Sequence, residues 1–253
     1  MPKKHLSFFV FNVEGLQSKL DDPTFHGNIS KYDVVVLLET WLPIDFQVNI
    51  PGYYSYSIYR PKNPKARRYS GGLTIMVKQH LRKGVKFLPH PNDLFIWFKL
   101  DKEFFHVAQD IYVCATYIPP KGSNIYTSKD ESPFQILESQ LITYSRLGDI
   151  ILCGDFNART GNLKDFIDND DDKDPCIDSI FDMTADLKVR NNRDSHISPF
   201  GRLLLDTCVS FNLVILNGRT KGDLSGQYTC YTHNTMRQVQ LTPQLMTQTF
   251  YGK

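Results

Sequence analysis

Several apolar runs of the sequence end in polar side chains of types that could do chemistry: Asn12, Glu39, Tyr117, and Asp155 with Asn157. In α/β proteins, ligands bind in the crevice beyond the ends of strands, so polar residues at these places are informative. Taken singly, each also fits a structural role in a turn, a helix terminus or the core. All of them lie at the same end of strands that should share one core, which favours a common site.

The residue types fit metal-assisted hydrolysis of a phosphodiester. Magnesium takes few protein ligands, usually one or two carboxylates with water and phosphate oxygens, and Glu39 with the amide of Asn12 would suffice. Asp155 and Asn157 stand two residues apart on a segment that we expect to be extended, so both side chains would reach one phosphate. The carboxylate can orient or deprotonate water, while the amide and the metal stabilise the developing oxyanion charge.

The elements that must position these residues are mostly strands. Apolar runs rich in β-branched and aromatic residues predict strands at Leu6–Val13, Asp33–Leu38, Leu73–Val77, Leu94–Leu100, Ile111–Tyr117, Asp149–Cys153 and Leu213–Leu216. Helices are predicted to begin at the Ser-Pro pairs of residues 132 and 198, and another to lie within residues 14–30. Strands interleaved with helices predict a layered α/β protein with the helices outside.

Two segments depart from a nearly neutral chain, which has 29 Lys and Arg against 27 Asp and Glu. Residues 60–68 hold five basic side chains and no acid. Such a loop could grip phosphates, or it could be a solvated loop of no special function. Residues 165–174 hold six acids and one lysine but lack the glycine and glutamate of a calcium loop. We interpret this stretch as a disordered acidic insertion.

The composition is that of a globular protein, with 253 residues of which 41% are hydrophobic. The five cysteines show no metal-knuckle spacing, which favours reduced thiols and an intracellular location, nuclear or cytoplasmic. We expect no signal peptide, no membrane contact and no obligate protein partner. P-loop, HExxH, GxSxG and CxxC motifs are absent, which disfavours nucleotide hydrolases, zincins, serine hydrolases and redox modules.

Four motifs occur together: FNVEGL at residues 11–16, LETW at 38–41, YIPP at 117–120 and GDFNAR at 154–159. With them the chain resembles the endonuclease/exonuclease/phosphatase superfamily, and most closely the apurinic-like endonuclease domains of non-LTR (LINE-type) retrotransposons. The resemblance covers about residues 6–232, including GRLLLD at 201–206 and NGRT at 217–220. It implies a DNase I-like four-layer α/β/β/α sandwich of two mixed sheets, and a Mg²⁺-dependent nick of DNA, with Mn²⁺ as a possible substitute.

The resemblance also implies a role for each candidate residue. Glu39 would be the metal carboxylate, Asn12 its neighbour at the metal and phosphate, Tyr117 a hydroxyl on the phosphate side, Asp155 the residue that orients the attacking water, and Asn157 the transition-state amide. The partner would be the DNA phosphate backbone, with contacts expected from Arg60, Lys62, Arg67, Arg68 and Arg159.

The C-terminal part departs from the family pattern. After the segment matching residues 228–230, family members continue into a strand with a further Asp and a final Ser-Asp-His that completes the active site. Residues 235–253 contain no Asp, Glu or His. The Asp-Ser-His string at 194–196 precedes a predicted helix and lies upstream, so we reject it as a substitute. We therefore expect a hydrolase domain at residues 1–232 that lacks its last strands, and a divergent polar tail at 233–253.

Three functions remain open from the sequence. The first is a DNA endonuclease domain of retroelement origin, with stability and nicking impaired by the departure at its C-terminal part. The second keeps the fold but acts on a small phosphate ester, such as an inositol phosphate or a sphingolipid head group. The third is a catalytically inactive remnant that binds nucleic acid or nothing.

Overall fold

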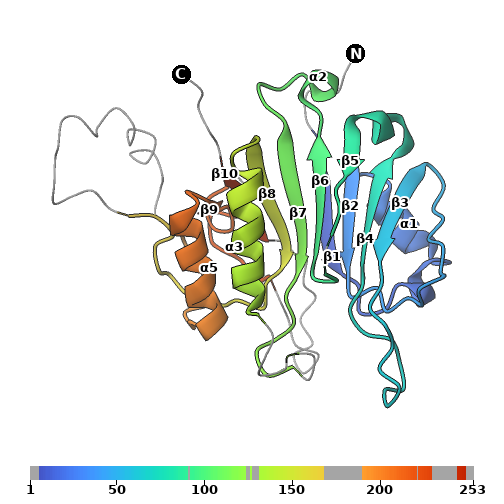
Figure 1. Cartoon of the computed structure of the whole chain (residues 1–253), viewed down its shortest axis with the longest axis horizontal. Helices are drawn as coiled ribbons and strands as arrows, with labels where there is room; N and C mark the ends of the chain where they lie inside the picture. The colour runs from blue at the N-terminus through green and yellow to red at the C-terminus, as the bar shows by residue number, and fades with distance from the viewer. Residues whose placement is uncertain are drawn as a thin grey trace. The chain divides into compact units, whose positions relative to one another are not determined.

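The structure is a computed structural model that describes residues 6–90, 92–123, 126, 131–167, 190–220, 222–229 and 244–248 (Figure 1). The chain forms two compact units, Met1–Phe156 and Asn157–Lys253. The first unit contains two mixed β-sheets and the helices that cover them. The described residues of the second include helix α5 (Pro199–Ser210) and a short pair of strands.

The first sheet has the strand order β1-β2-β4-β3. Its strands are β1 (Phe8–Asn12), β2 (Val34–Leu38), β3 (Tyr53–Ile58) and β4 (Leu73–Lys78). β1 and β2 are parallel, and β4 runs antiparallel to both of its neighbours. Asn12 pairs with Leu38, so the carboxyl ends of β1 and β2 meet at one edge of the sheet.

The central strand β2 is buried on both faces. Val35 and Leu37 pack in one hydrophobic cluster with Phe25 and Ile29 of helix α1 (Pro23–Ile29). The alternate residues of β2 point to the opposite face, where they are equally buried. This explains the unbroken run of large apolar residues, which is what a strand inside a sandwich requires.

The second sheet of the first unit consists of β5 (Val85–Phe87), β6 (Phe95–Leu100), β7 (Ile111–Tyr117) and β8 (Asp149–Asp155). β7 and β8 are parallel, and Tyr117 pairs with Asp155 at their carboxyl ends. The ring of Tyr56 on β3 stacks on Phe87 at 4.2 Å between centroids, which joins this sheet to the first.

Helix α3 (Pro133–Tyr144) covers the outer face of the second sheet (Figure 1). Trp97 Nε1 donates to Gln140 Oε1 at 2.7 Å, and Tyr144 stacks on Tyr112 at 5.3 Å. The helix begins as predicted, with the Ser132 N–H donating to the Gln135 side chain at 3.1 Å. The layers α1, sheet, sheet and α3 confirm the predicted α/β/β/α sandwich.

In the second unit, α5 (Pro199–Ser210) begins at Ser198, whose Oγ accepts from Gly201 N at 3.0 Å. Phe200, Leu204 and Cys208 of this helix are buried. Strands β9 (Val214–Ile215) and β10 (Gln244–Gln248) pair antiparallel. No strand was predicted at β10, because its residues show neither an apolar run nor alternation.

The expectation of a disordered acidic insertion is wrong for Asp165. Asp165 is buried, and its carboxylate forms a bidentate ion pair with Arg219, with both N···O distances at 2.6 Å. It also accepts from Ile215 N at 2.7 Å. Residues 168–174 of the stretch lie outside the described residues.

Some short elements were not predicted. β3 has alternating tyrosine and serine and is half-buried, β5 has only three residues, and α2 (Lys102–Phe105) is a single turn. In place of one helix within residues 14–30, the chain forms the 3₁₀ turn η1 (Gln17–Lys19) and then α1. Proline at the start of α1 has no N–H to continue a preceding helix. A second 3₁₀ segment, η2, covers Gln79–Gly84.

The described cysteines are Cys114, Cys153 and Cys208, and all three are buried free thiols. Burial raises the pKa of each thiol. Cys176 and Cys230 lie outside the described residues. Within the described part of the chain, no helix combines the length and apolar character needed to cross a bilayer.

Candidate active site

The candidate residues Asn12 and Glu39 come from the parallel pair β1 and β2. Asn12 ends β1, and Glu39 directly follows Leu38, the residue with which Asn12 pairs. Glu39 has a left-handed backbone with φ of 53°. Non-glycine residues adopt this conformation rarely and at an energetic cost, and such residues cluster at functional sites.

Asn12 links two carboxylates from different sheets. Its Nδ2 donates to Glu39 Oε1 at 2.7 Å and lies 3.4 Å from Asp155 Oδ2. Its Oδ1 accepts from Glu14 N at 3.3 Å. The structure therefore brings Asn12, Glu39 and Asp155 together, although 143 positions separate the first from the last.

Tyr117 completes this group from the end of β7. It pairs with Asp155 on β8, and its phenol lies close enough to the Glu39 carboxylate to sense that charge. Burial raises the pKa of Tyr117 far above its ordinary value, and the negative charges of Glu39 and Asp155 raise it further. The hydroxyl therefore stays protonated at neutral pH, where it can donate a hydrogen bond but cannot act as an anion.

The backbone at Asn157 differs from the extended conformation that we expected. β8 ends at Asp155, and Asn157 is left-handed with φ of 46°, so the segment between them is not extended. The expected extended segment therefore ends before Asn157, and the approach of both side chains to one phosphate stays a prediction. Asn157 is the first residue of the second unit.

The predicted DNA-contacting residues fall into two classes. Arg60 forms an ion pair with Asp93, its side chain is only 11% exposed, and its Cζ lies 6.0 Å from the centroid of the Tyr117 ring. Exposed basic side chains make up the second class: Lys62, Arg67, Arg68 and Arg159. Of these, Arg159 forms a bidentate ion pair with Asp194.

The rejected Asp-Ser-His string has a local role in the second unit. Asp194 accepts from the Arg159 guanidinium in two hydrogen bonds of 2.6 Å, and from His196 N at 3.0 Å. The hydrogen bond from Arg159 is the main cause that lowers the pKa of Asp194. The string thus fixes the loop that leads into α5.

Sequence reasoning missed two residues at this site. Trp41 Nε1 donates to Glu39 Oε2 at 3.2 Å, and Asp93 is the partner of Arg60. Trp41 stands two residues after Glu39 in the LETW motif, which was a usable signal. Asp93 gave no signal, because an acid just before a strand is common in loops.

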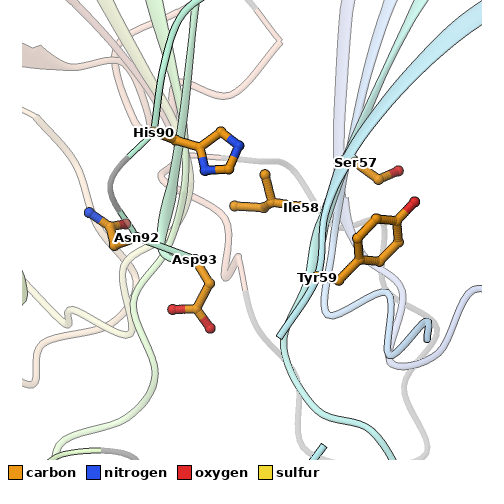
Figure 2. Close-up of a pocket in the computed structure, with 6 residues that line it drawn as sticks. All are labelled: Ser57, Ile58, Tyr59, His90, Asn92 and Asp93. Atoms are coloured by element: carbon orange, nitrogen blue, oxygen red, sulfur yellow. The ribbon is translucent and has the colours of Figure 1, made fainter. Parts of the chain in front are cut away.

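An open pocket of about 260 Å³ lies next to the Arg60–Asp93 pair. Its lining comes from the end of β3 and from the segment before β6: Ser57, Ile58, Tyr59, His90, Asn92 and Asp93. Figure 2 shows Ile58, His90 and Asp93 pointing into the space between the two segments. None of Asn12, Glu39 and Asp155 is among the residues that line it.

The donor set suits a hard divalent cation. The Glu39 and Asp155 carboxylates converge on one Asn12 nitrogen, and Glu39 accepts hydrogen bonds from the neutral groups of Asn12 and Trp41. Oxygen ligands of this kind fit Mg²⁺ or Mn²⁺. Among the described residues, no group of three or more His, Cys, Asp or Glu side chains could hold a metal. Mg²⁺ does not need three such protein ligands, since water and phosphate supply its other ligands.

Comparison with known proteins identifies relatives at the level of family and fold. Residues 9–229 match the sequence family described as the Endonuclease/Exonuclease/phosphatase family. A comparison with curated proteins gives no significant match.

Several solved structures share the fold. The 3'-5' exonuclease NExo from Neisseria meningitidis aligns with a TM-score of 0.57 at 16% identity, over 96% of this chain and 86% of that one. The catalytic domain of Xenopus laevis APE2 aligns with a TM-score of 0.56 at 12% identity, over 96% of this chain and 82% of that one. The endonuclease domain of TRAS1, a telomere-specific non-LTR retrotransposon, aligns with a TM-score of 0.48 at 14% identity, over 95% of this chain and 83% of that one. The first two support the DNase I-like sandwich.

Proposed function

We propose that this chain, which belongs to the endonuclease/exonuclease/phosphatase family, hydrolyses phosphodiester bonds in DNA with the help of Mg²⁺ or Mn²⁺. The observation that carries the proposal is the convergence of two carboxylates, one amide and one neutral hydroxyl at the ends of β1, β2, β7 and β8. Glu39 and Asn12 would hold the cation. When bound, the cation supplies a positive charge that stabilises oxyanion charge on the phosphate.

Each protein group has a role that its environment supports. Asp155 orients the attacking water and accepts its proton, because a carboxylate at the end of β8 can point beyond the sheet edge. Tyr117 donates a hydrogen bond to a phosphate oxygen, since its hydroxyl is protonated at neutral pH. We assign to Asn157 the amide that stabilises the transition state.

DNA is the substrate that the surface charges favour. Lys62, Arg67 and Arg68 are exposed on the loop that follows β3. One solved structure of the same fold is described as the 3' phosphatase NExo bound to product DNA hairpin. The motif order also resembles the endonuclease domains of LINE-type retrotransposons, and we propose that origin for this chain.

Salt dependence distinguishes DNA from a small phosphate ester. If the basic loop contacts phosphates, the affinity for a duplex should fall steeply as salt rises, and each lost contact should reduce the log–log slope by about one. The variant K62Q should flatten the slope, whereas K86Q, at an exposed position on β5, should not. Equal slopes for both variants would contradict contact at Lys62.

We further propose that turnover is low. The family pattern places a final Asp and His after the segment matching residues 228–230, and residues 235–253 contain neither. The hydrolase domain would then occupy residues 1–232. Replacement of the residues after Asn234 by a family-type C-terminus should increase the nicking rate.

The test is nicking of supercoiled plasmid in Mg²⁺, measured for the chain and for the version with a family-type C-terminus. The substitutions E39Q and D155N should abolish nicking in both. The matched carboxylate controls E103Q and D206N, both at exposed positions, should nick at the parent rate. The hydrolase proposal fails if neither version nicks. The cation role of Glu39 fails if E39Q retains full activity.

A further inference from the structure

Both oxygens of the Glu39 carboxylate have their own donor. Oε1 accepts from Asn12 Nδ2 at 2.7 Å, and Oε2 accepts from Trp41 Nε1 at 3.2 Å. The two donors come from different segments, so together they fix the rotation of the carboxylate plane. Trp41 is thus part of what orients the carboxylate proposed to hold the cation.

The contact between Glu39 and Trp41 depends on an unusual backbone. Both residues are left-handed, with φ of 53° and 52°. Such residues persist only where the surroundings hold them. Here the segment is bonded on both sides, with Gly15 N donating to Glu39 O at 2.8 Å and Trp41 N donating to Gly71 O at 3.0 Å.

The indole ring of Trp41 is also fixed in place. Gly15, at φ of 100°, leaves room for it, since a Cβ at that position would lie 3.0 Å from Trp41 Cε3. The Arg68 guanidinium carbon lies 4.0 Å from the centroid of the ring, in cation–π contact. Arg68 is exposed. Its planar group can therefore stack on the indole while its N–H groups face a phosphate.

We propose that Trp41 is a positioning residue that couples two binding events, a DNA phosphate at Arg68 and a divalent cation at Glu39. The face of the indole ring contacts the Arg68 guanidinium, and the indole N–H donates a hydrogen bond to the Glu39 carboxylate. Coupling between two sites is reciprocal, so the cation tightens DNA binding by the same factor by which DNA tightens cation binding. This inference rests on the proposed function, because it uses the cation site at Glu39.

The first measurement is Mn²⁺ binding to the free chain by calorimetry, which does not depend on turnover. W41F keeps an aromatic ring but removes the N–H, and it should weaken Mn²⁺ binding about tenfold, the effect of a lost hydrogen bond to a charged group. W97F makes the same chemical change at an indole that donates to Gln140. It should leave Mn²⁺ affinity unchanged.

The second measurement is duplex binding by fluorescence anisotropy, with Mn²⁺ and with EDTA. In the unmodified chain Mn²⁺ should tighten binding at least about fivefold. In R68Q the ratio of the duplex affinity with Mn²⁺ to that in EDTA should be close to one. R67Q loses the same charge on the same loop and should keep the ratio of the unmodified chain. R68Q lies at an exposed position, so it tests the coupling even if W41F does not fold.

The outcomes separate this inference from the proposed function. Mn²⁺ binding that is lost in E39Q but unchanged in folded W41F overturns the positioning role of Trp41 and leaves the cation site intact. Equal Mn²⁺ effects on duplex binding in R67Q and R68Q overturn the coupling. Absence of Mn²⁺ binding in the unmodified chain overturns the cation site, and the inference with it.

Discussion

Asn12 Nδ2 lies 2.7 Å from Glu39 Oε1, although 27 positions separate the two residues in the chain. Their strands are parallel neighbours, and the β1–β2 register places Asn12 beside the residue before Glu39. The same nitrogen lies 3.4 Å from Asp155 Oδ2. One amide therefore separates two carboxylates that would otherwise repel each other, which makes Asn12 a sensitive position for stability and for cation binding.

The substitution N12D replaces this amide with a third carboxylate. In EDTA we expect N12D to lower the free energy of unfolding by about 1–3 kcal/mol, because a donor is lost and like charges converge. Mg²⁺ should restore more stability to N12D than it adds to the unmodified chain, since binding to the folded state stabilises it. Urea unfolding with and without Mg²⁺ measures both effects.

The control for N12D is N49D, which adds the same charge at an exposed position. It should change stability little, and Mg²⁺ should affect it as it affects the unmodified chain. Equal behaviour of N12D and N49D would show that the carboxylates at Asn12 do not act as one charged group.

Gly154 is the residue that allows β8 to reach the site. It has φ of 142°, and a Cβ there would lie 1.9 Å from Thr116 O on the paired strand β7. G154A should therefore destabilise the chain by about 3 kcal/mol, at the upper end of overpacking costs. It should also reduce nicking, because Asp155 follows directly. Thermal unfolding and the plasmid assay test the two effects.

A matched glycine substitution is available in helix α1. Gly27 is exposed, and a Cβ there meets no atom within 4 Å. G27A should stabilise the chain by about 0.5–1 kcal/mol, because alanine loses less conformational entropy than glycine in a helix. If G154A proves as harmless as G27A, the close approach of β7 and β8 is not what requires glycine.

The Asp165–Arg219 pair should be important for stability. The Asp165 side chain is 0% exposed and that of Arg219 is 7% exposed. D165N should lower the free energy of unfolding by about 3–5 kcal/mol, since it leaves a buried guanidinium without its counter-charge. D194N breaks the Arg159 pair, in which Arg159 is 56% exposed, and should cost at most about 1 kcal/mol. Urea unfolding compares the two variants, and similar losses would contradict the difference in burial.

The Arg159–Asp194 pair should also give a pH dependence. The hydrogen bond from Arg159 lowers the pKa of Asp194 below its ordinary value of 3.8. The unfolded state therefore takes up the proton first as the pH falls, so the pair stabilises the fold above the ordinary pKa. That stability is lost as the pH falls from about 3.8 through the lowered pKa of the folded state.

The measurement is the difference in unfolding free energy between the unmodified chain and D194N as a function of pH. The difference should be constant near neutral pH and should shrink below about pH 4. A difference that persists unchanged into acid would show that Asp194 stabilises the loop without its charge.

The sequence alone predicted the layers of the fold. Long apolar runs such as β2 and β7 and the Ser-Pro starts of α3 and α5 are set by local residue types, so they were found near their observed bounds. β3, with half-buried tyrosines and serines, was missed because its strand state depends on pairing with β4. The polar residues at strand ends were recognised as candidates for the same local reason.

Only the tertiary structure decided which side chains meet. The register of β1 with β2 brings Asn12 to Glu39, and the position of β8 brings Asp155 to the same amide. Tertiary contacts also distinguish Arg60, which is half-buried and paired with Asp93, from Arg68, which is exposed and lies on Trp41. By sequence, Arg60 and Arg68 are two similar basic residues of one loop. Their burial and partners depend on segments far away in the chain, and local residue patterns carry no record of those contacts.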